Sequence, residues 1–398
     1  MSLIFRTAHG DFEIPVAEPR LTIIEILKAN GIPYHSVAMF RYSQATGSKR
    51  ITGLYEAYAD LHQGETIMLC TDRNIDYPAL LNKPIEFVRE AKAITEYSFD
   101  AHDEEDNTIS HVELTPEDCM AFVTDKVSLF LKDDVNLDPN AKIVVGVSGG
   151  GDSNAILHAL LGTGKIKKEQ LVPVMILGIP DWDKGRPWAE AICDNLGIKL
   201  TVLSSKDINT LLKRKTTSDD WAYDFEKLFP DADLEMIGTH AVRIGLRHIA
   251  LKEQAQAMIT GLNLEDLLAE AMLNLMQGER PLPFPVRTID EMDLWYPLYQ
   301  CPKKIIDGCF PKYALENYND RFPSKMYWRA ACYYLAQMVH PTLPGIEYTL
   351  LEGFKKMANT DKRKLYFDKK LGFSSTEKLD EETHAIWMKF LSGNTKNG

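Results

Sequence analysis

The chain has 398 residues and a net charge of −12, with 45% hydrophobic and 26% charged residues. These values are typical of a globular protein with two domains, or with one large domain and an appendage, and they exclude a wholly disordered, collagen-like or coiled-coil chain. No uncharged apolar run approaches the roughly 18 residues of a membrane span, and the first residues lack a signal peptide's layout. We therefore expect a cytoplasmic protein with no membrane partner.

The charge and the cysteines restrict the function further. Thirteen acidic residues and only two lysines lie between residues 95 and 140, so this segment carries nearly all of the net charge. A basic surface elsewhere stays possible, but the short basic runs at 165–168, 213–215 and 361–370 are weak evidence for a nucleic-acid partner. The six cysteines include no CxxC pair, so we expect reduced thiols and no local zinc or iron–sulfur motif.

Residues 1–82 have the pattern of a small β-rich domain. SLIFRT and DFEIPVA are short β segments, LTIIEILKANGI is an amphipathic helix, and HSVAMFRYS and ETIMLCT are β-rich. This order resembles a β-grasp, ubiquitin-like domain, and LHQGETIMLC resembles the end of its sulfur-carrier members. A sulfur carrier ends in Gly-Gly, whereas this chain continues without one. We expect either a docking or RNA-contact module or a structural cap.

The rest of the chain is predicted to form three further parts. Residues 83–140 are interpreted as an acidic linker with a helix from Pro116 to Lys132. In residues 141–300 the apolar runs KIVVGV, QLVPVMILG and IKLTVLS alternate with helical segments, which indicates a parallel, doubly wound α/β core buried on both faces. Residues 301–398 are predicted to be a helical C-terminal region.

A glycine-rich loop follows the first apolar run of this core. The sequence SGGGDS, Ser148 to Ser153, stands between that strand and the next helix. Glycines allow the backbone to approach a ligand, and the helix directs its free N–H groups and positive dipole end at the same place, which favours a phosphate. The loop has neither GK[ST] nor GxGxxG, so a Walker A or dinucleotide site is excluded. A bare glycine turn is the alternative.

The loop resembles SGGxDS, the signature of the PP-loop, N-type ATP pyrophosphatases. The resemblance implies that Asp152 helps to hold Mg²⁺ while a substrate oxygen attacks the α-phosphate of ATP, which yields an adenylate and pyrophosphate. It also implies that adenine lies near Leu177 and Gly178. The residues that would bind phosphate are Ser148, Gly149, Gly150, Gly151 and Ser153.

Three later segments resemble the tRNA 2-thiocytidine and 2-thiouridine synthetases of this superfamily. They are MITGLNLEDLLAEAMLNLMQGE from Met258, LWYPLYQCPKKII and HPTLPGIEYTLLEGFKKM, and they follow the loop in the family's order. The resemblance adds Gly261 to the nucleotide-binding residues and Asp266 to the catalytic residues. It also puts Arg243 about where the family keeps a basic residue that could contact the α-phosphate, although a structural helix arginine is the alternative.

The departures from that family are equally specific. No cysteine lies in 233–240 or 316–325, where the family has a CxxC and a third cysteine, so no iron–sulfur cluster is expected. Leu262 replaces the family's histidine and Glu265 its first aspartate. Buried structural thiols are expected at Cys301, Cys309 and Cys332, with a sulfur relay through Cys301 or Cys309 as the alternative.

These observations predict an ATP- and Mg²⁺-dependent enzyme that adenylates a nucleobase carbonyl, most simply in tRNA, and then transfers sulfur from an external donor. One alternative is adenylation of a small molecule for thiolation or amidation. Another is a nucleotide-binding sensor or scaffold without turnover. A homodimer is a possible assembly.

Overall fold

The computed structural model describes most of the chain as two compact units. One unit comprises residues 1–90 and 327–349, and the other comprises residues 91–326 and 350–398. The residues described are 2–7, 10–30, 37–43, 45, 47–71, 94–103, 106–216, 220–229, 234–311, 327–342, 344–360, 365–376 and 378–393.

The first unit contains the predicted β-grasp domain. Its strands run in the order β2-β1-β5-β3-β4, with β1 parallel to β5 and the other neighbours antiparallel. Its core is formed by its own side chains, including the fully buried Leu3, Phe5, Leu27 and Leu69. This order and packing confirm the β-grasp prediction. The elements of the unit are β1 (Ser2–Thr7), β2 (Gly10–Pro15), α1 (Ile23–Ala29), β3 (Val37–Ser43), β4 (Gly47–Ile51), α2 (Tyr58–His62), β5 (Thr66–Thr71) and α14 (Tyr327–Thr342).

The acidic segment is more regular than the sequence indicates. Strands β6 (Thr95–Asp103) and β7 (Asp106–Leu114) pair as an antiparallel hairpin, where we expected a linker. The strands end at Asp103 and Asp106, in the most acidic part of the sequence, which favoured the interpretation as a linker. The predicted helix is confirmed as α4 (Pro116–Asp133), which begins at a capping box between Thr115 and Asp118.

The predicted parallel α/β core is confirmed, with one antiparallel strand added at an edge. The strand order is β10-β9-β8-β11-β13-β12, and only β12 runs antiparallel to its neighbour. The central strands β8 and β11 are buried except for Gly146, because helices cover both faces of the sheet. The strands are β8 (Ile143–Gly146), β9 (Leu171–Ile176), β10 (Thr201–Leu203), β11 (Ala257–Ile259), β12 (Val286–Ile289) and β13 (Met292–Trp295).

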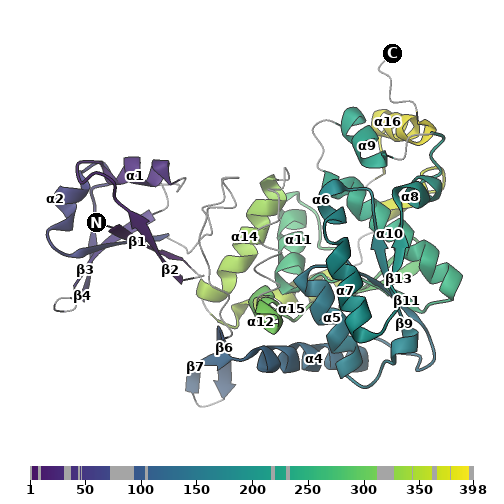
Figure 1. Ribbon diagram of the computed structural model, residues 1–398, viewed down its shortest axis with the longest axis horizontal. Coiled ribbons are helices and arrows are strands. Elements are labelled where there is room, and N and C mark those ends of the chain that lie inside the picture. The colour runs from purple at the N-terminus through teal and green to yellow at the C-terminus, as the bar shows by residue number, and fades with distance from the viewer. Residues whose placement is uncertain are drawn as a thin grey trace. The chain divides into compact units, whose positions relative to one another are not determined.

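The connections of this sheet create a point where the strand order reverses. The chain runs from β8 through β9 to β10, and then returns to β11 on the other side of β8. Helices α5 and α7 lie on one face of the sheet and α10 on the other (Figure 1). Open α/β sheets bind ligands beyond the carboxyl ends of their strands at such a point. The helices of the core are α5 (Gly151–Gly162), α6 (Pro180–Asp183), α7 (Arg186–Leu196), α8 (Ser205–Leu211), α9 (Trp221–Leu228), α10 (Leu234–Glu253) and α11 (Leu264–Met276), with a short 3-10 turn, η2 (Lys168–Gln170).

The C-terminal region is mainly helical, as expected, but it also contains a short hairpin. Its elements are α12 (Lys303–Cys309), α15 (Ile346–Thr360), β14 (Tyr366–Asp368), β15 (Phe373–Ser375) and α16 (Glu381–Ser392). Phe373 and Trp387 from this region pack against Phe225, Phe229 and His240. Burial in this aromatic cluster lowers the pKa of His240 to about 3, so the imidazole is neutral at physiological pH.

Among the helices of the described residues, none combines the length and the apolarity that crossing a membrane requires.

Candidate active site

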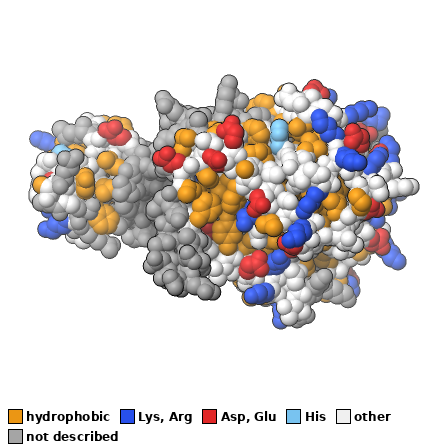
Figure 2. Space-filling view, turned by 90° about the horizontal axis from the view of Figure 1, so that it is seen from below, with side chains coloured by type: hydrophobic (Ala, Val, Ile, Leu, Met, Phe, Trp, Pro, Cys, Tyr) orange, Lys and Arg blue, Asp and Glu red, His pale blue; other side chains and the backbone are white. Residues whose placement is uncertain are grey.

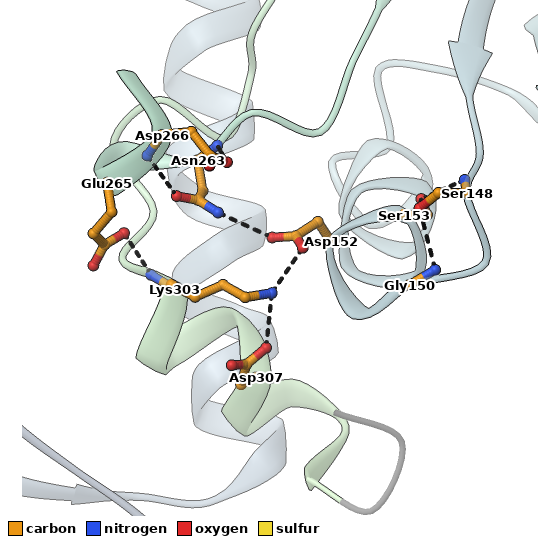
Figure 3. Close-up of polar contacts among 9 residues, drawn as sticks. All are labelled: Ser148, Gly150, Asp152, Ser153, Asn263, Glu265, Asp266, Lys303 and Asp307. Carbon is orange, nitrogen blue, oxygen red and sulfur yellow. Dashed lines mark hydrogen bonds and ion pairs between the residues drawn. The ribbon is translucent and has the colours of Figure 1, made fainter. Parts of the chain in front are cut away.

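The glycine-rich loop leads from the end of β8 into the first turn of α5. The Ser148 N–H donates to the Ser153 hydroxyl at 2.9 Å, and the Gly150 N–H donates to the Ser148 hydroxyl at 3.3 Å (Figure 3). The N-cap of α5 is Gly150, which supplies no side-chain cap. The start of α5 therefore presents uncapped N–H groups at the switch point of the sheet, which is the geometry of an anion site.

Two glycines let this loop lie directly against the start of α7. Gly149 has a φ of +84°, and a Cβ atom on it would lie 2.1 Å from the carbonyl oxygen of Gly185. A Cβ atom on Gly185 would lie 2.2 Å from the carbonyl oxygen of Ser148. Backbone therefore packs on backbone here, and neither position has room for a side chain. The sequence analysis did not identify Gly185, although it follows the second strand in a segment that contains two glycines.

Asp152 joins the loop to the segment that follows β11 through a hydrogen bond. One carboxylate oxygen accepts a hydrogen bond from the Asn263 amide at 3.2 Å, and the other is 2.7 Å from the Lys303 ammonium (Figure 3). A Cβ atom on Gly261 would lie 3.3 Å from that of Asp152, so the two segments approach closely. The structure thus brings together Asp152 and Gly261, as expected. It adds Asn263 and Lys303, to which the sequence analysis gave no role.

Lys303 is the first residue of α12, and acidic groups surround it. Its ammonium is also 2.9 Å from a carboxylate oxygen of Asp307, and its backbone N–H donates to Glu265 at 2.8 Å. Burial raises the pKa of Glu265 to about 8, so this carboxyl is mainly protonated at neutral pH. Asp152, Asp307 and Lys303 then leave one net negative charge. The role of Asp152 in holding Mg²⁺ stays a prediction, and Lys303 is the cation that lies beside it.

Asp266 acts through the cap of α11. Its carboxylate accepts the Asn263 N–H at 3.1 Å, and its own N–H donates to the Asn263 side chain at 3.1 Å. This capping box orients the amide that contacts Asp152. The described contacts of Asp266 thus fix Asn263, while direct contact with nucleotide stays a prediction.

The residues expected beside adenine follow β9. The Leu177 N–H donates to the Leu203 carbonyl at 2.9 Å, and the Gly178 N–H donates to Asp183 at 2.9 Å. Gly178 has a φ of +124°, and a Cβ atom on it would lie 2.1 Å from the indole nitrogen of the buried Trp221. The indole therefore covers one side of Gly178. Adenine binding at this place stays a prediction.

Arg243 contacts the β12–β13 turn and β15. Its guanidinium is 3.4 Å from the Asp290 carboxylate, and it donates to the Ser374 carbonyl at 3.2 Å. The His240 ring lies 3.1 Å away. These contacts join α10 to the β12–β13 turn and to β15, in agreement with a structural helix arginine. They leave the predicted contact with the α-phosphate without support.

The described cysteines are buried and reduced, as expected of structural thiols. Burial raises the pKa of Cys193 to about 11 and that of Cys309 to about 12, and it also raises the pKa of Cys301. Such thiols are poor nucleophiles at neutral pH. Among the residues that the structure describes, no group of three or more His, Cys, Asp or Glu side chains could hold a metal ion. Residues 316–325, where the family's third cysteine would fall, lie outside the described residues.

Comparison with known proteins gives one family match and several similar solved structures. Residues 123–232 match the family model of NAD synthase. A search of curated proteins found no match. Similar solved structures include the U34-tRNA thiolase NcsA from Methanococcus maripaludis, solved with its 4Fe–4S cluster, at 20% identity and a TM-score of 0.47 over 62% of this chain and 82% of that chain. The NH3-dependent NAD synthetase from Campylobacter jejuni has 14% identity and a TM-score of 0.33 over 64% and 98% of the two chains. The NMN synthetase from Francisella tularensis has 14% identity and a TM-score of 0.34 over 64% and 98%.

The sheet order, the loop and the uncapped start of α5 define a doubly wound α/β domain with the geometry of an anion site at its switch point. Residues 123–232, which contain the SGGGDS sequence and match the NAD synthase model, have the features of a PP-loop ATP pyrophosphatase domain.

Proposed function

We propose that the protein transfers AMP from ATP to a carbonyl oxygen of an acceptor, releases pyrophosphate, and then lets a second nucleophile displace AMP. The observation that carries this proposal is the position of Asp152. It lies at the switch point of the sheet, in the first turn of α5, and contacts a lysine from a neighbouring segment. Enzymes that cleave ATP between the α- and β-phosphates need both a phosphate cradle and groups that offset the developing charge.

The residues at this site fit both ATP and Mg²⁺. The backbone N–H groups at the start of α5 and the hydroxyls of Ser148 and Ser153 suit the phosphate chain, while the Asp152 carboxylate is the oxygen ligand that Mg²⁺ prefers. When bound, Mg²⁺ would neutralise charge on the leaving pyrophosphate. Lys303 lies close enough to Asp152 to reach the same phosphates. Gly149 and Gly185 keep the loop in place.

The acceptor that we favour is a nucleobase carbonyl in tRNA, with sulfur as the second nucleophile. The segments around Gly261 and Lys303, which resemble the tRNA thiolation enzymes in sequence, contact the loop through Asp152. The described thiols are buried, and burial raises the pKa of Cys301 beside the site. Sulfur would therefore come from an external persulfide or thiocarboxylate donor.

A second candidate is the activation of a small molecule for amidation or thiolation. The match of residues 123–232 to NAD synthase favours it. On the face shown in Figure 2, the described Lys and Arg side chains are scattered, with acidic and uncharged groups between them. A face of this kind does not favour the multiple phosphate contacts of a nucleic acid.

The first experiment measures pyrophosphate release from ATP and Mg²⁺ with candidate acceptors present. Replacement of Asp152 by Asn should reduce the rate about a hundredfold or more, because it removes the metal-binding charge from a preorganised site. The matched control is Asp125→Asn on the exposed face of α4, which should retain the parent rate. If Asp152→Asn forms pyrophosphate as fast as the parent, the role assigned to Asp152 is wrong.

The same assay separates the candidate functions. Release that depends on tRNA and falls steeply with salt supports the RNA acceptor, since phosphate contacts release counterions. Release that depends on a small carboxylate or amide and is insensitive to salt supports the second candidate. ATP binding without pyrophosphate release under any acceptor would indicate a sensor instead of an enzyme.

A further inference from the structure

We propose that Asp307 is a positioning residue that holds the Lys303 ammonium beside the phosphate loop while Asp152 binds the metal ion of the nucleotide. The inference rests on the proposed use of ATP at this site. It assigns a role to a carboxylate that does not belong to the loop and that the SGGGDS motif does not indicate.

The argument begins with the contacts that Asp152 already makes. One of its oxygens accepts from Asn263 at 3.2 Å, and the other accepts from Lys303 at 2.7 Å. A divalent cation that binds Asp152 would share the carboxylate with these two donors. The Asn263 amide is neutral and fixed by the cap of α11, whereas the Lys303 ammonium would repel the cation. Lys303 is therefore the group that must move.

Asp307 is placed to receive it. Lys303 and Asp307 are four residues apart on α12, and the ammonium is already 2.9 Å from the Asp307 carboxylate. A Cβ atom on Gly151 would lie 3.6 Å from the same carboxylate oxygen, so Asp307 also borders the first turn of α5. Figure 3 shows the lysine reaching between the two aspartates. A small movement of the side chain would keep Lys303 at the loop.

The backbone of Lys303 does not need to move. Its N–H donates to Glu265 at 2.8 Å, which fixes the start of α12 against α11. Without Asp307, the ammonium would still contact Asp152 and would compete with the metal ion for it. Replacement of Asp307 should therefore weaken the binding of the nucleotide with Mg²⁺ more than the binding of the nucleotide alone.

The test measures binding by titration calorimetry with α,β-methylene-ATP, an analogue whose α–β linkage cannot be cleaved. The proteins are the parent, Asp307→Asn, Lys303→Met, the double variant and Asp307→Glu, with Asp125→Asn as the control, each with and without Mg²⁺. We expect Asp307→Asn to weaken binding with Mg²⁺ about three- to fivefold, a small effect because the carboxylate is partly exposed. Asp307→Glu should restore most of the affinity.

The double variant decides whether Asp307 acts through Lys303. If it does, Asp307→Asn should change affinity less than about 1.5-fold in the Lys303→Met background. An equal loss in both backgrounds would overturn the proposal, because Asp307 would then act directly on the metal ion or on the fold. Unchanged affinity in Asp307→Asn would also overturn it. Should Asp307→Asn fail to fold by circular dichroism, Asp307→Ser takes its place in the same cycle. If the parent protein does not bind the analogue in the presence of Mg²⁺, the proposed function itself is refuted.

Discussion

Gly149 and Gly185 fix the position of the phosphate loop because neither residue has a Cβ atom. The loop can then lie on the first turn of α7 with two carbonyl groups in the space that side chains would occupy. The positive φ of Gly149 adds a conformational reason to the steric one, since residues with a Cβ atom rarely adopt it. The arrangement of the candidate site therefore depends on two residues that carry no functional group.

Replacement of Gly149 by Ala should disrupt the loop. The added Cβ atom would lie 2.1 Å from the backbone oxygen of Gly185, which cannot move without shifting α7. We expect a loss of about 2–4 kcal/mol in the free energy of unfolding and no measurable binding of ATP.

The measurements are urea denaturation and calorimetry, and the matched control is Gly164→Ala. Gly164 has a φ of +68°, but no atom lies within 4 Å of the added Cβ. The control carries the backbone strain alone and should cost about 1 kcal/mol while ATP still binds. Equal losses in the two variants would contradict the steric argument.

At the scale of single residues, the sequence predicts the loop better than it predicts the distant residues that contact the loop. Ser148 to Ser153 are contiguous, and their glycines and their position after an apolar strand identify a phosphate site. Asn263 and Lys303 lie 111 and 151 positions from Asp152, so only the fold brings them together. Arg243 is a different case. The sequence analysis estimated from spacing that it could contact the α-phosphate, whereas its contacts in the structure are with Asp290 and Ser374.

At the scale of elements, α11 and α12 are joined at their first turns by Glu265. Its carboxyl is buried, which raises the pKa from 4.5 to about 8, although the Lys303 N–H donates to it. The folded protein thus keeps a proton that the unfolded chain loses as the pH rises. Stability should fall between about pH 5 and pH 8 on account of this group, and the cost is complete above pH 8.

Replacement of Glu265 by Gln should remove this pH dependence. The Gln side chain can still accept from the Lys303 N–H, but it has no charge to desolvate. We expect the variant to gain on the order of 2–4 kcal/mol relative to the parent between pH 5 and pH 8. Urea denaturation at several pH values measures the difference, and parallel curves for the two proteins would contradict the raised pKa.

Helices and strands could be predicted where their apolar residues follow a regular pattern in the sequence. Strands β8, β9 and β10 were predicted because buried parallel strands are continuous apolar runs, and α4 because its apolar residues have helical spacing. Three hairpins, β6–β7, β12–β13 and β14–β15, were not predicted. The strands of the second and third are three or four residues long, and the tip of the first is acidic. Such strands depend on hydrogen bonds to a partner strand, and the spacing of apolar residues in the sequence does not reveal that pairing.

At the scale of the molecule, each unit has a core of its own. The β-grasp core is formed by residues between Leu3 and Leu69, and the α/β core by the helices on both faces of the second sheet. The described groups that contact the phosphate loop all come from the second unit. We therefore predict that the β-grasp unit can be destabilised without loss of nucleotide binding.

Replacement of Leu69 by Ala tests this separation. Leu69 is fully buried in β5, and its truncation should cost about 2–5 kcal/mol in the unfolding of the β-grasp unit. The affinity for α,β-methylene-ATP with Mg²⁺ should stay within about twofold of the parent, since the groups described at the loop belong to the second unit. The matched variant is Leu268→Ala, which is equally buried in α11 and should lower both the stability of the α/β unit and the affinity. A large loss of affinity in Leu69→Ala would show that the nucleotide site depends on the β-grasp core, which would contradict the predicted separation.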